Sequence, residues 1–266
     1  MRGGVVSGAL TQKAWLTIPS PQATAPIRLF AFPYGGGGPS IFAQWPRWLP
    51  REIEVCAVQM PGRDARLGEA PLTRWSEAIP QLVAALTPWM DRPYALFGHS
   101  LGAVLAFEVA HALPASARSR LLHLFVSGRR APHLPADETL ALDLPDHVIV
   151  EELKRLAGTP GEILESAEMM EVYLPLLRAD FTLSETYAYQ ARGPLRVPLS
   201  AYGGATDAEV PSADVAAWRH HTAAAFRQRT FAGGHFFLND QRSALVAHLA
   251  FELSETITRT GVLTSR

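Results

Sequence analysis

The residues with the clearest chemical potential form a G-H-S-L-G pentapeptide at residues 98–102. It lies directly between an apolar run at residues 94–97 and a second apolar stretch at residues 103–112, which predict a strand and then a helix. A serine on such a tight turn is exposed, and glycines on both sides let the strand and helix backbones pass closely. The pattern therefore predicts that Ser100 is a nucleophile in acyl transfer.

A serine hydroxyl is a weak nucleophile at its free pKa, so a general base must lie within hydrogen-bonding reach. In proteins with this strand-turn-helix motif, an acid and then a histidine follow the serine along the chain. Of the nine histidines, His220 and His221 end a predicted helical stretch and His248 lies within another. His235 instead follows two glycines just after the last predicted strand, at the sheet edge where α/β proteins place their sites. We expect His235 to be the base.

The acid that orients this histidine should follow another strand, ahead of His235 in the sequence. Asp207 meets this requirement, because it comes shortly after the predicted strand at residues 198–202 and after two glycines that permit a sharp turn. Asp214 is the alternative, but it lies early in a predicted helix, where the helix dipole stabilises a carboxylate. We therefore predict a catalytic triad of Ser100, Asp207 and His235.

The glycine-rich segment at residues 35–38 is the candidate for binding the oxyanion of the tetrahedral intermediate. It follows the first parallel strand, where this architecture supplies one backbone N–H, and the residue after the nucleophile supplies the other. The predicted donors are the N–H groups of Gly35 and Leu101. A phosphate-binding loop is the weaker interpretation, because the segment lacks the lysine of a P-loop and the G-x-G-x-x-G spacing of a dinucleotide site.

Short apolar runs alternate with helical patterns along most of the chain, which predicts a mostly parallel central sheet flanked by helices. The expected fold class is α/β, with the organisation of an α/β-hydrolase. The predicted strands are residues 27–32, 54–59, 94–97, 123–127, 198–202 and 227–231, with an antiparallel edge strand at 15–18. The predicted helices outside the region described next are residues 75–90, 103–113 and 213–225.

The alternation is interrupted between residues 129 and 192, where two or three amphipathic helical stretches follow one another. We interpret residues 131–192, approximately, as a helical lid inserted into a single domain that spans residues 1–266, because no linker or repeat divides the chain. The strongest helical segment, residues 166–189, carries a stripe of apolar residues at helical spacing. They are Met169, Val172, Tyr173, Leu176, Leu177, Phe181 and Tyr187.

Composition and charge exclude several classes of function. With 48% hydrophobic and 18% charged residues, the chain has the composition of an ordinary globular protein. A net charge of -1 gives no broad positive surface for nucleic acid. The single cysteine, Cys56, lies in an apolar run and is expected to be buried. Because the sequence shows no bilayer-spanning run, export signal or metal-binding motif, we expect a cytoplasmic protein without a metal site.

Five short motifs in a fixed order resemble those of type II thioesterases, the editing enzymes of polyketide and nonribosomal peptide synthesis. They cover the chain from about residue 27 to 240, and together they are far more specific than the serine pentapeptide. One departure is that many relatives have alanine followed by two glycines where this chain has Gly35 to Gly38. The motifs are F-P-Y-G-G-G (32–37), Q-M-P-G-R (59–63), L-F-G-H-S-L-G-A (96–103), L-R-A-D-F (177–181) and G-G-H-F-F (233–237).

The resemblance implies a stand-alone hydrolase that removes stalled or aberrant acyl groups from the phosphopantetheine arm of acyl or peptidyl carrier proteins, in antibiotic and related biosynthesis. It implies no cofactor of the enzyme itself, a monomer, and the triad and oxyanion donors already assigned. For Arg63 and Asp180, which recur in the motifs, it implies only an ion-pair or hydrogen-bond role. The candidate substrate-binding residues are Tyr34, Leu176, Leu177, Phe181 and Phe236.

Carrier proteins are usually acidic, so a local basic patch would aid docking. Arg129 and Arg130, at the start of the predicted lid, are candidates for such a patch, although a solvated face without a docking role is the favoured interpretation.

Three other functions stay open at this stage. A general carboxylesterase or lipase would use the same triad and oxyanion loop on oxygen esters, and only the motifs outside the triad argue against it. A chain-terminating thioesterase or cyclase separated from a megasynthase is a second possibility. The initiating methionine and the short length are expected to favour a free-standing protein instead. A non-catalytic α/β-hydrolase binding protein is a third, and it predicts a missing triad residue, whereas all three are present.

Overall fold

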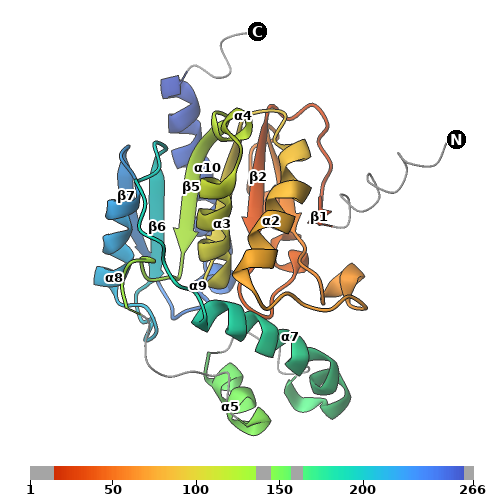
Figure 1. The fold of residues 1–266 in the computed structure, drawn as a ribbon. Helices are drawn as coiled ribbons and strands as arrows, with labels where there is room; N and C mark the ends of the chain where they lie inside the picture. Colours follow the sequence, from red (N-terminus) through yellow and green to blue (C-terminus); the bar gives the residue numbers. More distant parts are fainter. Residues whose placement is uncertain (1–14, 136–144, 157–163, 261–266) are drawn as a thin grey trace, which may run out of the picture.

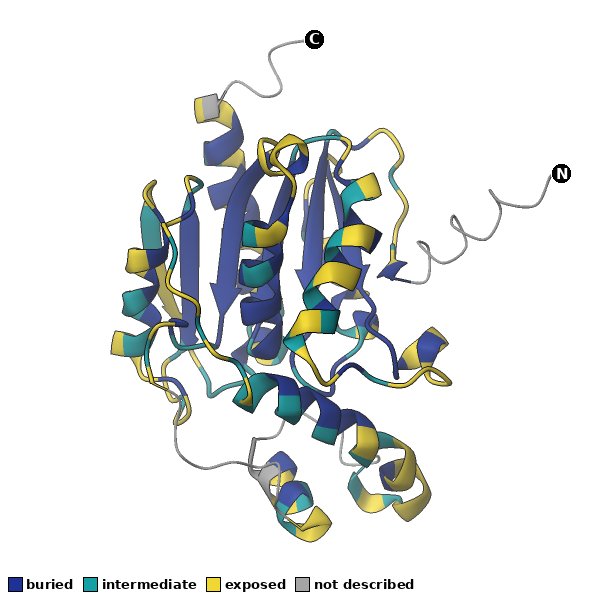
Figure 2. Ribbon diagram, in the orientation of Figure 1, coloured by how far each residue is buried: buried dark blue, intermediate teal, exposed yellow. Residues whose placement is uncertain are grey.

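The computed structural model describes residues 15–135, 145–156 and 164–260, and in these residues seven strands form one sheet in the order β1-β3-β2-β4-β5-β6-β7. Strand β1 pairs antiparallel with β3 at one edge, and every other pairing is parallel. The apolar strands β2 to β5 are buried along their whole length, as expected for a parallel sheet covered on both faces (Figure 2). The strands are β1 Leu16–Thr17, β2 Ile27–Phe32, β3 Ile53–Val58, β4 Tyr94–His99, β5 Leu121–Ser127, β6 Leu199–Gly204 and β7 Phe226–Phe231.

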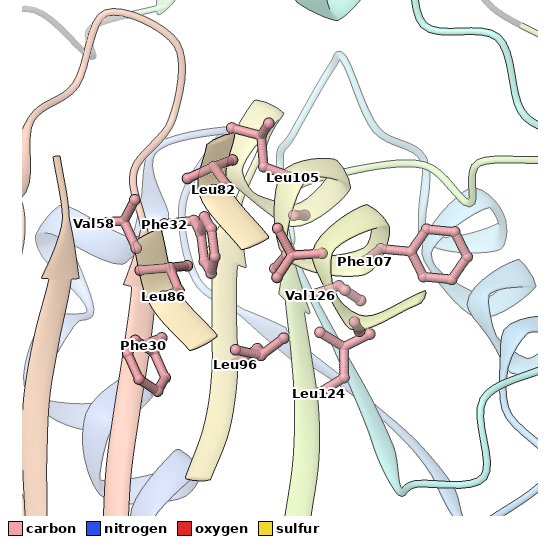
Figure 3. Close-up of a cluster of buried hydrophobic side chains, with 14 of the residues drawn as sticks. Phe30, Phe32, Val58, Leu82, Leu86, Leu96, Leu105, Phe107, Leu124 and Val126 are labelled. Carbon is pink, nitrogen blue, oxygen red and sulfur yellow. The ribbon is translucent and has the colours of Figure 1, made fainter. Parts of the chain in front are cut away.

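Helices cover both faces of this sheet (Figure 1). Because side chains alternate along a strand, Phe30 and Phe32 of β2 pack into the cluster formed with α2 and α3, shown in Figure 3. Leu29 and Ala31 belong to the cluster on the opposite face, together with residues of α10. The covering elements are α2 Trp75–Leu86, α3 Leu101–Ala112, α4 Ala115–Arg118, α8 Ser212–Ala216, α9 Phe237–Asp240 and α10 Arg242–Thr260, with short 3-10 turns at Pro39–Phe42, Trp45–Arg47, Asp64–Arg66, Thr87–Trp89 and Ala217–His221.

In the described part of the predicted insertion between β5 and β6, two helices have their full bounds. They are α5, Asp146–Leu156, and α7, Ala167–Glu185. Helix α7 crosses the end of the sheet toward which the parallel strands point, and α5 lies on its far side (Figure 1). The parts of the predicted lid at residues 136–144 and 157–163 are outside the described residues. The extent of a single domain and the movement of this insertion as a lid stay predictions.

Two predicted helices end earlier than expected. Helix α2 ends at Leu86 rather than at residue 90, because Pro88 has no N–H to donate to the Ala84 carbonyl oxygen and only a 3-10 turn follows. The stretch predicted as helix over 213–225 ends at His221, and Thr222 is extended, with φ −131° and ψ 140°. The β-branched Thr222 instead forms a parallel bridge with Leu195.

The apolar stripe of α7 is less uniform than its spacing predicts. Met169 and Val172 in the first half of the helix are exposed, and Tyr187 lies beyond its end. Leu176 and Leu177 are buried in its middle.

None of the helices in the described residues combines the length and the apolar composition that a membrane-spanning segment needs.

A buried histidine joins the sheet to α10 on the face opposite α3. The His123 Nε2 atom lies 2.9 Å from Ser200 Oγ, and its Nδ1 atom lies 3.1 Å from Thr256 Oγ1. The imidazole is stacked on Phe125, with ring centroids 4.0 Å apart. Burial, with nearby Arg227 and Arg259, lowers the pKa of His123 to about 3. The folded protein therefore keeps this imidazole neutral at pH values where the unfolded chain protonates it.

Replacing His123 with glutamine should make folding stability less sensitive to acid. The unfolded chain binds this proton near its ordinary pKa of 6.5, whereas the folded protein binds it only near pH 3. The stability that depends on the neutral imidazole is therefore present above pH 6.5 and lost as the pH falls toward 3. Removing one such group lowers the slope by up to about 1.4 kcal/mol per pH unit. Urea unfolding of both proteins between pH 7 and 4 measures this, and equal slopes would contradict it.

Candidate active site

Ser100 occupies a strained turn between β4 and α3. Its φ of 52° and ψ of −118° lie outside the regions that residues with a side chain normally adopt. A Cβ atom on Gly98 would come within 2.0 Å of the Gly102 carbonyl oxygen, and one on Gly102 within 2.3 Å of the Phe32 carbonyl oxygen. Only glycine fits at either position. The two glycines therefore allow α3 to start directly beside the ends of β4 and β2, with Ser100 at the apex.

The backbone around Ser100 favours a negative charge beside its side chain. The Ser100 N–H donates to the Ser127 carbonyl oxygen at 2.8 Å, which ties the turn to the end of β5. Leu101 is the first residue of α3, so its N–H belongs to the first turn, where helical N–H groups lack partners within the helix. The partial positive charge of a helix N-terminus adds to this effect. An oxyanion formed at Ser100 would face this end of the helix.

Asp207 and His235 meet in two loops that follow β6 and β7. The Asp207 Oδ2 atom lies 2.9 Å from His235 Nδ1. The other carboxylate oxygen, Oδ1, accepts the N–H groups of Glu209 at 2.9 Å and Val210 at 3.2 Å. The Asp207 side chain is fully buried, and that of His235 is 11% exposed. A buried carboxylate held in this way accepts a hydrogen bond from the Nδ1–H group and leaves Nε2 as the basic nitrogen.

The two loops are joined through their backbones as well. The Ala205 N–H donates to the Phe231 carbonyl oxygen at 2.8 Å, and the Thr206 N–H donates to that of Gly233 at 3.0 Å. A Cβ atom on Gly204 would lie only 2.3 Å from the Gly234 carbonyl oxygen, so this contact also requires glycine. The distance between acid and base is therefore set by backbone contacts at the sheet edge.

The alternative acid and bases have other partners. Asp214 is at the start of α8, where its Oδ2 lies 3.7 Å from Arg130 Nε. The ring nitrogens of His221 and His133 are 2.7 Å apart, and His248 lies 3.3 Å from Glu252. The structure brings Asp207 and His235 together, as the sequence predicts. Their catalytic role stays a prediction.

His99 contributes to the site although the sequence analysis did not assign it a function. It is fully buried, and its ring centroid lies 5.3 Å from that of His235. Its Nδ1 atom is 2.9 Å from Ser127 Oγ. Burial, together with the nearby His235, holds the pKa of His99 well below its ordinary value. The neutral imidazole of His99, the residue that precedes Ser100, thus packs against His235. Its place directly before the serine is the only sequence signal for this role.

The predicted oxyanion loop forms a tight turn at residues 34–37. The Gly37 N–H donates to the Tyr34 carbonyl oxygen at 2.9 Å, and Gly36 has a φ of +77°, as in a type II turn. Gly35 has no positive φ, and a Cβ atom there would make only ordinary contact with Asp180. The alanine that many relatives carry at this position is therefore compatible with the observed backbone.

The turn is held by a buried ion pair between Arg63 and Asp180. The two side chains are 5% and 1% exposed, and Arg63 Nη2 lies 2.9 Å from Asp180 Oδ1. Arg63 Nη1 donates to Asp180 Oδ2 at 3.1 Å and to the Gly37 carbonyl oxygen at 2.8 Å. The structural ion-pair role expected for these two residues is confirmed, and the structure adds that they contact the oxyanion loop.

The candidate substrate-binding residues lie around this region with different degrees of burial. Tyr34 packs edge-on against Phe236, with ring centroids 4.7 Å apart. Leu177 is fully buried in a cluster with residues of α5, Leu176 is 4% exposed, and Phe181 is partly buried. Their contact with substrate stays a prediction.

Arg129 and Arg130, the candidates for a docking patch, both have partners within the chain. The Arg129 guanidinium donates to the Ser184 hydroxyl of α7 at 2.8 Å, and burial lowers its pKa to about 10. Arg130 donates to the Pro135 carbonyl oxygen at 3.0 Å and lies near Asp214. Arg129 thus contacts α7 instead of lying on a solvated face as expected, and the absence of a docking role for this pair stays a prediction. Among the described residues, no group of three or more His, Cys, Asp or Glu is arranged to hold a metal ion.

A thioesterase domain model matches residues 27–252, which include the serine turn, the oxyanion loop and the Asp207–His235 pair. The chain therefore belongs to the thioesterase family and is a hydrolase that acts on thioesters. Its sheet has the order and flanking helices of the α/β-hydrolase type, and the predicted fold class is confirmed. The solved type II thioesterase BorB from the borrelidin biosynthetic cluster has a TM-score of 0.83 and 35% identity, over 91% of this chain and 98% of BorB.

Two further relatives are similar to this chain over most of its length. Thioesterase PikA5 from Streptomyces venezuelae is 39% identical, over 85% of this chain and 81% of that protein. LgrE from Brevibacillus parabrevis, named linear gramicidin dehydrogenase, is 42% identical, over 88% of this chain and 90% of that protein. The present chain has no G-x-G-x-x-G dinucleotide spacing that would support a dehydrogenase activity.

Asp207→Asn should abolish most of the thioesterase activity, whereas Asp214→Asn should not. The amide cannot hold His235 in the tautomer that leaves Nε2 free, and the corresponding change in serine triads lowers kcat about 10⁴-fold. Asp214→Asn is the matched control, since Asp214 pairs with Arg130. Steady-state hydrolysis of a small acyl thioester distinguishes them, and comparable losses in both variants would contradict the assignment.

Proposed function

We propose that the protein is a stand-alone type II thioesterase that removes stalled or aberrant acyl groups from the phosphopantetheine arm of carrier proteins. The proposal is carried by the Asp207–His235 pair, whose imidazole packs against His99, the residue directly before the strained Ser100 turn. Membership of the thioesterase family and the likeness to BorB and PikA5 support the reaction and its biosynthetic setting.

The reaction proceeds in two half-reactions through an acyl-enzyme. His235 Nε2 removes the Ser100 proton as Oγ attacks the thioester carbonyl, and Asp207 stabilises the imidazolium that forms. The carbonyl π electrons move to the oxygen, which the N–H groups of Gly35 and Leu101 bind. Collapse of this intermediate expels the thiolate, which takes the proton from His235. A thiolate is a good leaving group, because the pKa of a free thiol such as that of cysteine is near 8.5.

In the second half-reaction His235 takes a proton from water, which attacks the Ser100 ester. Collapse of the second tetrahedral intermediate returns the proton to Ser100 and releases the carboxylic acid. The enzyme needs no cofactor for these steps, because phosphopantetheine belongs to the carrier protein.

Helix α7 lies across the end of the sheet that carries the site, so the acyl group and its arm would pass beside it (Figure 1). In the proposal, Tyr34, Leu176, Leu177, Phe181 and Phe236 line this path. The monomeric state and the cytoplasmic location stay predictions from the sequence.

Hydrolysis of carrier-bound acyl groups tests the proposal. A carrier protein loaded with acetyl, propionyl or longer acyl-phosphopantetheine is incubated with wild type and Ser100→Ala, and p-nitrophenyl esters of the same acids are run in parallel. We expect Ser100-dependent release of carrier-bound acids, with a higher kcat/KM than for the matched esters. Fast ester hydrolysis with untouched carrier thioesters would overturn the proposal in favour of a general esterase. Inactivity on both substrates would favour a binding protein.

A further inference from the structure

One face of α7 packs directly on the oxyanion turn at residues 34–37. Tyr173, Leu177 and Asp180 are separated by four and three residues and therefore share a face of the helix. A Cβ atom on Gly36 would lie 2.6 Å from both Leu177 Cδ2 and the Tyr173 hydroxyl oxygen. Gly36 thus leaves no space between the turn and the helix.

The polar contacts of this face fix the backbone on both sides of Gly36. The Gly36 N–H donates to Asp180 Oδ2 at 2.6 Å, and the Tyr173 hydroxyl donates to the Gly36 carbonyl oxygen at 2.7 Å. The carbonyl oxygen of Gly37 accepts from Arg63 at 2.8 Å. Successive peptide groups in a segment of adjacent glycines, which is otherwise the most mobile kind of backbone, are therefore held by side chains.

The direction of the Gly35 N–H follows from these contacts. The Gly37 N–H holds the carbonyl oxygen of the Tyr34–Gly35 peptide group at 2.9 Å. Because a trans peptide is planar, the Gly35 N–H at its other end points the opposite way, out of the turn. The orientation of this N–H thus depends on where Gly36 and Gly37 are held, and helix α7 with Arg63 holds them.

The charge of Asp180 also requires its partner. A buried carboxylate beside a developing oxyanion would oppose catalysis by repulsion. The Arg63 guanidinium binds both oxygens of Asp180, so the pair carries no net charge toward the site.

We propose that Asp180 and Tyr173 are positioning residues for the thioesterase reaction. They hold the turn at residues 34–37 so that the Gly35 N–H faces the oxyanion, and the oxyanion site is therefore complete only while α7 is docked on the turn. This inference deepens the proposed function and rests on its assignment of Gly35 as an oxyanion donor. In this proposal, the oxyanion site forms when α7 docks on the turn.

The test compares Tyr173→Phe and Asp180→Asn with wild type on S-propanoyl-N-acetylcysteamine, a thioester that needs no carrier protein. Reactive sites are counted by titration with a fluorophosphonate, so that kcat refers to folded enzyme. Loss of one oxyanion donor costs about 100- to 1,000-fold in kcat, and a misdirected donor keeps part of its effect. We expect kcat to fall about 10-fold in Tyr173→Phe and about 100-fold in Asp180→Asn, with KM within about twofold of wild type.

Affinity for a trifluoromethyl ketone of the same acyl length provides the second readout, since its adduct with Ser100 mimics the tetrahedral oxyanion. It should weaken in proportion to kcat. Tyr187→Phe is the matched control, because it removes a hydroxyl that donates to Glu108 Oε1 at 2.6 Å rather than to the turn. This variant should keep the wild-type kcat and ketone affinity.

The outcomes separate the possible failures. A lower count of reactive sites with unchanged kcat per site and unchanged ketone affinity would mean a merely structural role and would overturn the inference. If Asp180→Asn does not fold because Arg63 is left unpaired, Tyr173→Phe decides alone, and wild-type values in it would overturn the inference. Ser100-dependent hydrolysis of the small thioester without action on acyl-carriers would refute only the proposed substrate. Absence of Ser100-dependent hydrolysis of both the small thioester and the acyl-carriers would overturn both proposals.

Discussion

The close passage of α3 over the ends of β4 and β2 is the constraint on which the site depends. Gly98 and Gly102 permit backbone contacts that no side chain could accommodate, and Ser100 takes up the resulting strain at a positive φ. The same passage directs the start of α3 toward the serine and places the turn at residues 34–37 nearby, since a Cβ atom on Gly102 would lie within 2.5 Å of the carbonyl oxygens of Phe32 and Pro33. The loops after β6 and β7 place the buried Asp207 and its partner His235 at this same edge of the sheet.

Most of this arrangement could be predicted because it follows from chain order and local pattern. The strand-turn-helix around Ser100, the strands and the pairing of Asp207 with His235 all leave short-range signals, either glycines or positions just after strands. The end of the stretch predicted as helix at 213–225 could not be read locally, because it depends on the bridge between Thr222 and the distant Leu195. The exposed Met169 and Val172 likewise show that helical spacing alone does not tell which turns of a helix are covered.

The contacts between α7 and the oxyanion turn were the least predictable part of the site. Asp180 is 144 residues from Gly36 and 117 from Arg63, so no local pattern connects them. The spacing of Tyr173, Leu177 and Asp180 on one helical face was visible, but the sequence does not state what that face meets. Because a glycine-rich turn has little conformational preference of its own, side chains from the inserted helix supply the order that the turn lacks. In the proposal, α7 is therefore part of the framework that positions the Gly35 N–H.

Detection of an acyl group on Ser100 tests the central claim most directly. The enzyme is mixed with excess propionyl thioester, quenched in acid within milliseconds, and analysed by intact mass and by sequencing of the peptide that contains residues 98–102. The account predicts a propionyl adduct on Ser100 that appears before steady state, disappears as substrate is consumed, and is absent from Ser100→Ala. Turnover without an adduct, or an adduct on another residue, would contradict a mechanism built on this turn.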